Sequence, residues 1–260
     1  MIRKILHIIL WSALIAGVVL ALAFTGKYHR QTVCQAFKVE ILNPGPDALT
    51  DAEALRSLII SHTDTLEGKT LADIDPYAIH AVLKSNPYVK NVDVQTNIAG
   101  EVTAEVGLRQ AILRIVGNDG KSYYIDEEGW LMPVNPGFSA RVPVMNGSVP
   151  EGISINTDKG TSINLLEGGD AIRNIYDLAL YIHRDKFLRR LISQIWISRK
   201  GELEMIPLIG EYTIKFGGFD DMQKKLENLS VFYREGASKA GWIDYRSIDL
   251  RYENQVICSK

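Results

Sequence analysis

The stretch DPYAIHAVLKSNPYVKNVDV, residues 75–94, decides the fold of the first half of this chain. It opens with an aspartate followed by a proline, the pair typical of a helix N-cap and first helical position. Ile79 and Leu83 lie four residues apart, on one face of a helix, and Asn86-Pro87 ends that helix. Residues 92–94 then alternate apolar and polar side chains, as a half-buried strand does. The stretch predicts a helix that leads directly into a strand.

The flanking segments complete a small unit around this stretch. Phe37–Ile41 alternates as a strand, and Thr50–Glu53 has the spacing of a capping box at the start of another helix. Val102–Leu108 alternates again, after a turn at Asn97–Gly100. The predicted order is strand–helix–helix–strand–strand, which gives a three-stranded sheet with two helices on one face. At least one edge of such a sheet is free to pair with another strand.

The second half is predicted to be a mixed, β-rich domain with two helices, so the fold class of the chain is α+β. Apolar stripes at helical spacing run through residues 172–182 and 219–233. Alternation and turn residues predict strands at Ala111–Val116, Tyr123–Ile125, Leu131–Met132, Ile192–Ser198, Leu203–Ile206, Tyr212–Phe216 and Ile248–Tyr252.

The N-terminus carries an uncharged apolar segment. Residues 5–24 span about 20 positions, or about 30 Å of helix, which matches the hydrocarbon thickness of a bilayer. This predicts a cytoplasmic tail at 1–4, a single transmembrane helix at 5–25 and a linker at 26–36, with the remainder in the periplasm. The alternative is a cleaved signal peptide, with Ala21-Leu22-Ala23 as its cleavage site. The apolar run is longer than a signal peptide needs, which favours the retained helix.

Composition and motifs argue against several functions. A net charge of −2 without a basic stripe argues against nucleic-acid binding. Gly117–Ser122 ends like a phosphate-binding loop but has the wrong glycine spacing and precedes a strand, so a hairpin turn is predicted. Asp126–Glu128 is interpreted as a solvated turn. The histidines and cysteines do not cluster, so we predict no catalytic residue, no metal site, no cofactor and no small-molecule substrate. A bridge between Cys34 and Cys258 stays open, with no disulfide favoured.

Four segments taken in order resemble one family, the bacterial cell-division proteins FtsQ/DivIB. The similarity covers nearly the whole chain, as far as Tyr252. The segments are residues 86–92 (NPYVKNV), 121–129 (KSYYIDEEG), 142–147 (VPVMNG) and 245–252 (YRSIDLRY). The resemblance implies a POTRA-like domain at 37–108 and an FtsQ-type β domain at 109–260.

The resemblance also implies a function. Family members are non-enzymatic, bitopic scaffolds of the divisome at the septum of the inner membrane. They link septal cell-wall synthesis proteins by binding small partners such as FtsB and FtsL. The POTRA-like unit would help localisation through other membrane partners, with Val39–Ile41 or Val102–Val106 as its edge.

The candidate partner-binding site lies at the C-terminal strand. Alternation predicts that Ile248, Leu250 and Tyr252 face the core while Asp249 and Arg251 point outward. If this strand is an edge, its backbone groups are free to pair with an added partner strand. The resemblance matches Tyr252 and Arg251 to binding residues of the family, and the alternative for Tyr252 is core packing. The predicted partner-binding residues are Ile248, Asp249, Leu250, Arg251, Tyr252 and Asn254.

Two other classes of function remain as alternatives. One is a secreted envelope hydrolase delivered by a cleaved signal peptide. The other is a component for outer-membrane assembly or secretion that uses its POTRA-like unit to hand over substrate strands. The first predicts a mature N-terminus near Thr25. The second usually brings several POTRA units or a membrane barrel, and the sequence has neither pattern.

Overall fold

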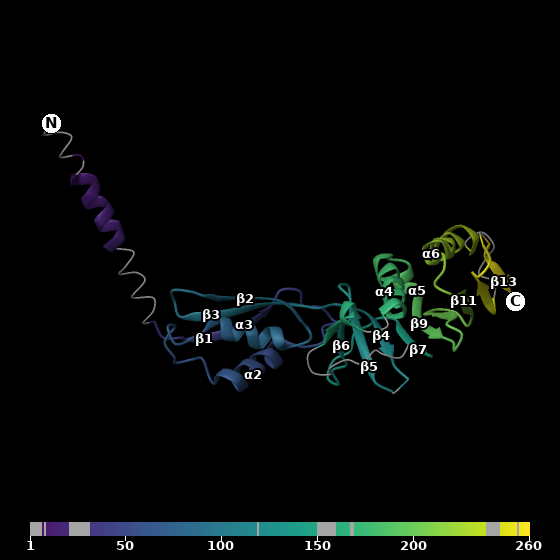
Figure 1. Ribbon diagram of the computed structural model, residues 1–260, viewed down its shortest axis with the longest axis horizontal. Helices are drawn as coiled ribbons and strands as arrows, with labels where there is room; N and C mark the ends of the chain where they lie inside the picture. Colours follow the sequence, from purple (N-terminus) through teal and green to yellow (C-terminus); the bar gives the residue numbers. More distant parts are fainter. Residues whose placement is uncertain are drawn as a thin grey trace. The chain divides into compact units, whose positions relative to one another are not determined.

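The computed structural model describes residues 7, 9–20, 32–118, 120–149, 160–166, 169–237, 245–253 and 255–260 (Figure 1). The chain divides into two compact units. The first comprises Met1–Pro44 and Asp51–Leu108, and the second comprises Gly45–Thr50 and Arg109–Lys260. Each unit has its own sheet and its own core.

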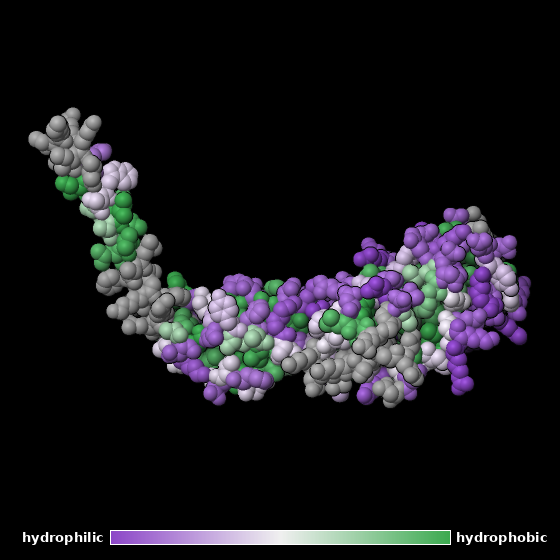
Figure 2. All heavy atoms as spheres, viewed as in Figure 1, coloured by the Kyte–Doolittle hydropathy of each residue, from purple (hydrophilic) through white to green (hydrophobic). Residues whose placement is uncertain are grey.

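Residues 9–20 form a helix near the N-terminus, and its surface is apolar (Figure 2). The predicted tail at 1–4 lies outside the described residues, as do parts of the predicted span at 5–25 and of the linker at 26–36. Within the part of the chain that the structure describes, no helix has both the length and the apolar character needed to cross a bilayer.

The first unit has the predicted element order. It consists of β1 (Ala36–Ile41), α2 (Ala52–Thr63), α3 (Pro76–Ser85), β2 (Val89–Thr96) and β3 (Glu101–Leu108). The strand order is β1-β3-β2, with β1 parallel and β2 antiparallel to β3. Val102–Val106 is therefore no edge, because β3 pairs on both sides, whereas β1 and β2 are the edges. That candidate edge was wrong because alternation reports burial of one face and does not report the number of neighbouring strands.

Helices α2 and α3 each begin at an aspartate that caps the helix. The Asp75 side chain accepts a hydrogen bond from the Tyr77 backbone N–H at 2.9 Å, and Pro76 occupies the first turn. At α2 the cap is Asp51, which accepts from Ala54 N at 2.7 Å, so the capping-box prediction that began at Thr50 was one residue early. Thr50 is instead buried.

The second unit is built on a sheet of 10 strands in the order β13-β12-β11-β10-β9-β7-β4-β5-β6-β8. The first strands along the chain are β4 (Ala111–Val116), β5 (Ser122–Asp126), β6 (Trp130–Pro133), β7 (Val144–Gly147) and β8 (Thr161–Ser162). The remaining strands are β9 (Ile192–Ile197), β10 (Leu203–Pro207), β11 (Thr213–Gly217), β12 (Ser247–Asp249) and β13 (Ile257–Ser259).

Helices α4, α5 and α6 of this unit lie on the same side of the sheet in Figure 1. The helical segments are η1 (Ile163–Leu165), α4 (Gly169–Arg184), α5 (Leu188–Leu191), α6 (Met222–Val231) and the π-helix η2 (Phe232–Ala237). The predicted stripe of α4 is confirmed: Ile172, Ile175, Ala179 and Ile182 are all buried in the core against the sheet. The fold class predicted for the two units is confirmed as a mixed, sheet-rich α+β chain.

Candidate partner-binding edge

The sheet of the second unit ends in three short strands. Strand β11 pairs in parallel with β12, and Ile214 lies opposite Ile248. Strand β12 in turn pairs antiparallel with β13, where Ile248 lies opposite Cys258. The predicted last strand, Ile248–Tyr252, therefore ends at Asp249, and the condition that it forms an edge is not met, because it has a neighbour on each side. The edge is β13, one strand further along the chain.

The burial of the predicted site residues does not follow the predicted alternation. Ile248 and Leu250 are buried, as predicted. Asp249 is also buried, although it was predicted to point outward, and Tyr252 is 53% exposed, although it was predicted to face the core. Arg251 is exposed as predicted. Asn254 lies outside the described residues.

A local turn explains why the alternation fails after Asp249. The Asp249 carboxylate accepts hydrogen bonds from Arg251: Oδ1 from the backbone N at 3.1 Å and from Nε at 2.9 Å, and Oδ2 from Nη2 at 2.7 Å. An aspartate that binds the backbone N–H two residues later favours a turn over a strand. The chain therefore leaves the sheet at Asp249, and Tyr252 no longer follows the strand period.

The same hydrogen bonds stabilise the ionised form of Asp249. The guanidinium of Arg251 holds the pKa of Asp249 below its ordinary value, mainly through the side-chain hydrogen bonds. Arg251 therefore already has a carboxylate of its own chain as its partner. A partner's acidic residue would have to compete with Asp249, so Arg251 is a weaker candidate for partner binding than the sequence indicated.

Gly217 makes room for this arrangement at the end of β11. Its φ is +79°, in the region that favours glycine, and a Cβ there would lie 2.9 Å from Cγ of Arg251. Beyond it, the buried Lys225 of α6 donates to the carbonyl of Gly218 and to Oδ2 of Asp220, both at 3.0 Å. The hydrogen bond from Lys225 lowers the pKa of Asp220. These contacts hold α6 against the segment that follows β11. Tyr252 and Glu253 line a depression next to α6.

Strand β13 is the last strand at this end of the sheet. Cys258 packs toward the core, where burial raises the pKa of its thiol, while Ile257 and Ser259 are exposed. Within the described ranges, no strand pairs with the far side of β13. Alternate N–H and C=O groups of an antiparallel strand point away from its one neighbour, so part of the β13 backbone is open to pairing. Three residues are too few for sequence periodicity to reveal the strand.

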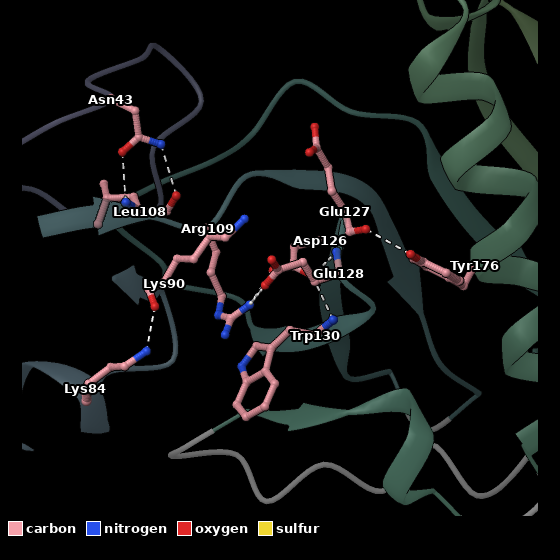
Figure 3. Close-up of polar contacts among 10 residues, drawn as sticks. All are labelled: Asn43, Lys84, Lys90, Leu108, Arg109, Asp126, Glu127, Glu128, Trp130 and Tyr176. Carbon is pink, nitrogen blue, oxygen red and sulfur yellow. Dashed lines mark hydrogen bonds and ion pairs between the residues drawn. The ribbon is translucent and has the colours of Figure 1, made fainter. Parts of the chain in front are cut away.

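A second polar cluster has a structural role (Figure 3). Asp126 was predicted to lie in a solvated turn, but it is buried and its Oδ2 accepts from Nη1 of Arg109 at 2.7 Å. Its Oδ1 accepts from the backbone N–H groups of Glu128 and Trp130 at 2.8 and 2.7 Å. The Arg109 guanidinium lies 4.6 Å from the centre of the Trp130 ring. The turn between β5 and β6 is thus organised around one buried carboxylate.

The structure also describes both cysteines and most of the Gly117–Ser122 segment. Cys34 is buried, Cys258 is half-buried, and both are free thiols. Gly117 and Lys121 form the connection between β4 and β5, where the Gly117 N–H donates to the Lys121 carbonyl at 2.8 Å, as expected of a hairpin and not of a phosphate loop. Among the residues that the structure describes, no three histidine, cysteine or acidic side chains gather as metal ligands.

Taken together, a β-α-α-β-β unit and a larger sheet that ends in an open edge define a two-unit chain of the POTRA-containing class. A POTRA-like domain model matches residues 32–107. A family model described as FtsQ/DivIB, C-terminal related, matches residues 110–259, which is more than half of the chain. The chain therefore belongs to the FtsQ/DivIB family.

One relative extends the comparison over most of the chain. The cell division protein FtsQ of Rhodothermus marinus is 24% identical to it over 194 residues, which cover 73% of this chain and 67% of that protein. The resemblance found in the sequence motifs is thus confirmed at the level of the family and of a role in cell division.

Proposed function

We propose that this chain is a non-enzymatic scaffold of the division machinery that binds an extended segment of a partner along β13. The family membership and the cell-division relative support the setting. The observation that carries the mode of binding is the open side of β13 at the end of a 10-stranded sheet. A strand added there gains main-chain hydrogen bonds for affinity and side-chain contacts for specificity.

The partner is an FtsB-like bitopic division protein, bound together with an FtsL-like protein. A strand of the partner beside β13 extends the sheet and covers the exposed side chain of Ile257. Tyr252, in the connection between β12 and β13, contributes its exposed ring next to that strand. Aromatic side chains are frequent among the residues that dominate binding energy, so Tyr252 is the strongest of the predicted site residues.

In this proposal the chain crosses the inner membrane once, with the N-terminus in the cytoplasm and both units in the periplasm at the septum. Uncharged residues 5–24 support the anchor. The edges β1 and β2 of the first unit are available to other membrane proteins of the divisome. Mass spectrometry of the membrane-extracted protein tests the anchor, because an intact N-terminus is expected and a mature N-terminus near Thr25 contradicts it.

A photo-crosslinking residue placed in the full chain tests the binding mode. At position 257 on β13 it is expected to link the FtsB-like partner. At position 165, an exposed leucine next to β8 at the other end of the same sheet, it is expected to link none. Equal crosslinking at both positions, or crosslinking at 165 alone, contradicts partner pairing at β13.

A further inference from the structure

The corner between α4 and β9 concentrates positive charge on the surface of the second unit. Lys186, Arg189 and Arg190 are exposed, and none of them has an ion-pair partner among the described residues. Asp185 lies among them, but its Oδ1 accepts from the backbone N–H groups of Phe187 and Leu188 at 2.8 and 2.9 Å. In a chain of net charge −2, this corner is locally cationic.

Two aliphatic side chains protrude beside these cations. Leu208 is 68% exposed and Ile209 is 80% exposed, in the connection between β10 and β11. The connection lies against α5, because the Leu208 backbone N–H donates to the Leu191 carbonyl at 2.6 Å. Side chains exposed to this extent stand out from the surface and do not line a groove.

An aromatic group fixes this connection in place. Gly210 has φ of +103°, and a Cβ there would collide with the ring of Tyr212. The Tyr212 hydroxyl is hydrogen-bonded to the Tyr233 hydroxyl, and the Tyr233 ring lies 5.4 Å from the ring of Phe187. Phe187 is itself exposed and stands at the start of α5, the same short helix whose end the Leu208 connection contacts. We call this surface the basic corner; its residues are Lys186, Phe187, Arg189, Arg190, Leu208 and Ile209.

We propose that the basic corner is a site of contact with an anionic lipid surface. Protruding aliphatic and aromatic side chains next to lysine and arginine are the combination that binds the interface of a bilayer, where apolar groups enter and cations meet headgroup phosphates. An acidic peptide would share the charge complementarity, but it would offer the two protruding aliphatic side chains no apolar phase to enter. The exposure of Leu208 and Ile209 favours the lipid surface. The inference stands apart from partner binding at β13.

The test uses the full chain reconstituted with phosphatidylcholine vesicles, with or without phosphatidylglycerol, whose acyl chains carry bromine. A fluorescent amino acid at position 209 is expected to lose emission through quenching by the brominated chains when phosphatidylglycerol is present. The same probe at position 165 is the control, because Leu165 is as exposed and belongs to the same unit. Each arginine of the corner changed to glutamine is expected to weaken the contact about fivefold, so Arg189→Gln with Arg190→Gln removes most of the quenching.

The outcomes separate the proposal from its rivals. Quenching at position 209 alone, dependent on phosphatidylglycerol and on the two arginines, supports it. No quenching at position 209, or equal quenching at 165 and 209, overturns it. Should Leu208→Ser with Ile209→Ser abolish capture of an acidic protein while position 209 shows no quenching, the corner binds protein and the lipid proposal fails. Because the probe reports lipid contact and not partner pairing, it is independent of crosslinking at position 257.

Discussion

Two arginine–aspartate pairs in the second unit have the same chemistry and different surroundings. Arg109 and Asp126 have side chains that are 11% and 3% exposed, while Arg251 and Asp249 have side chains that are 42% and 12% exposed. Both aspartates also accept backbone N–H groups and thereby shape a turn. The first turn joins the neighbouring strands β5 and β6. The second turn follows β12 and begins the connection to the edge strand β13.

The difference shows how burial assigns a role to an ion pair. A buried charge that loses its partner is costly, so the pair at Asp126 holds the fold together. A half-exposed arginine remains hydrated, so the pair at Asp249 contributes less stability and mainly sets the direction of the following residues. The consequence of the second turn is that Tyr252 is exposed and leaves the period of the strand.

Asp126→Ala is expected to have the largest effect. It leaves Arg109 buried without its main carboxylate and removes the acceptor of two backbone N–H groups, which costs about 3–5 kcal/mol in the free energy of unfolding. Chemical denaturation followed by tryptophan fluorescence measures the change. The control is Glu128→Ala, whose half-exposed carboxylate lies 3.3 Å from Arg109 and should cost about 1 kcal/mol or less. Equal costs for the two variants would remove the distinction between the buried and the exposed pair.

Tyr252→Ala is expected to act on binding and not on folding. Loss of the exposed ring should weaken binding of the FtsB-like partner by about 2 kcal/mol, or roughly 30-fold, because buried interface tyrosines commonly contribute this much. Titration of the partner into the full chain measures it. Tyr77→Ala, which changes an exposed tyrosine of the first unit, is the matched control and should leave this affinity unchanged. Unaltered affinity in Tyr252→Ala would show that the ring takes no part.

Asp249→Asn is expected to cost about 1–2 kcal/mol at neutral pH, because it weakens the charged hydrogen bonds to Arg251. The pKa of Asp249 is lowered in the folded state, so its contribution is present above the unfolded value of about 3.9 and is lost as pH falls through the folded value. The difference in unfolding free energy between wild type and variant should therefore shrink below about pH 4. A constant difference down to about pH 2 would mean that the carboxylate is not the source.

Gly217→Ala is expected to show the smallest difference from its matched control. Alanine in this left-handed conformation costs about 1–2 kcal/mol, and its Cβ also presses on the stem of Arg251. Gly201→Ala is the matched control, because its φ is +78° and no described atom lies within 4 Å of the added Cβ. The excess cost at Gly217, up to about 1 kcal/mol in thermal or chemical unfolding, isolates the contact with Arg251. No excess would show that the stem simply moves aside.

The sequence predicted the elements with strong periodicity and missed those fixed by tertiary contacts. The stripe of α4 and the alternation of β3 identified a helix and a strand correctly, because both present one face to a core. Strand β13 has three residues, so it carries no usable period. The sequence around Asp126 is acidic and typical of a surface turn. Its ion-pair partner Arg109, which allows its burial, is distant in the sequence and cannot be found from the neighbouring residues.

The sequence located the candidate residues near the end of the sheet, and their role in partner binding stays a prediction. The residues around Tyr252 do lie at the end of the sheet, yet the edge belongs to the next strand. Alternation extended β12 past Asp249 because Leu250 is apolar and buried, although the Asp249–Arg251 turn has already ended the strand. Side-chain turns of this kind compete with strand pairing over only a few residues, so a period of two does not detect them.

Residue-resolved hydrogen exchange of the full chain, with and without the FtsB-like partner, tests the central claim most directly. Pairing of a partner strand slows exchange of backbone amides in Ile257–Ser259 that point away from β12, while the edge strands β1 and β2 of the first unit keep their rates. Saturating binding of the partner with unchanged exchange throughout β13 would contradict it.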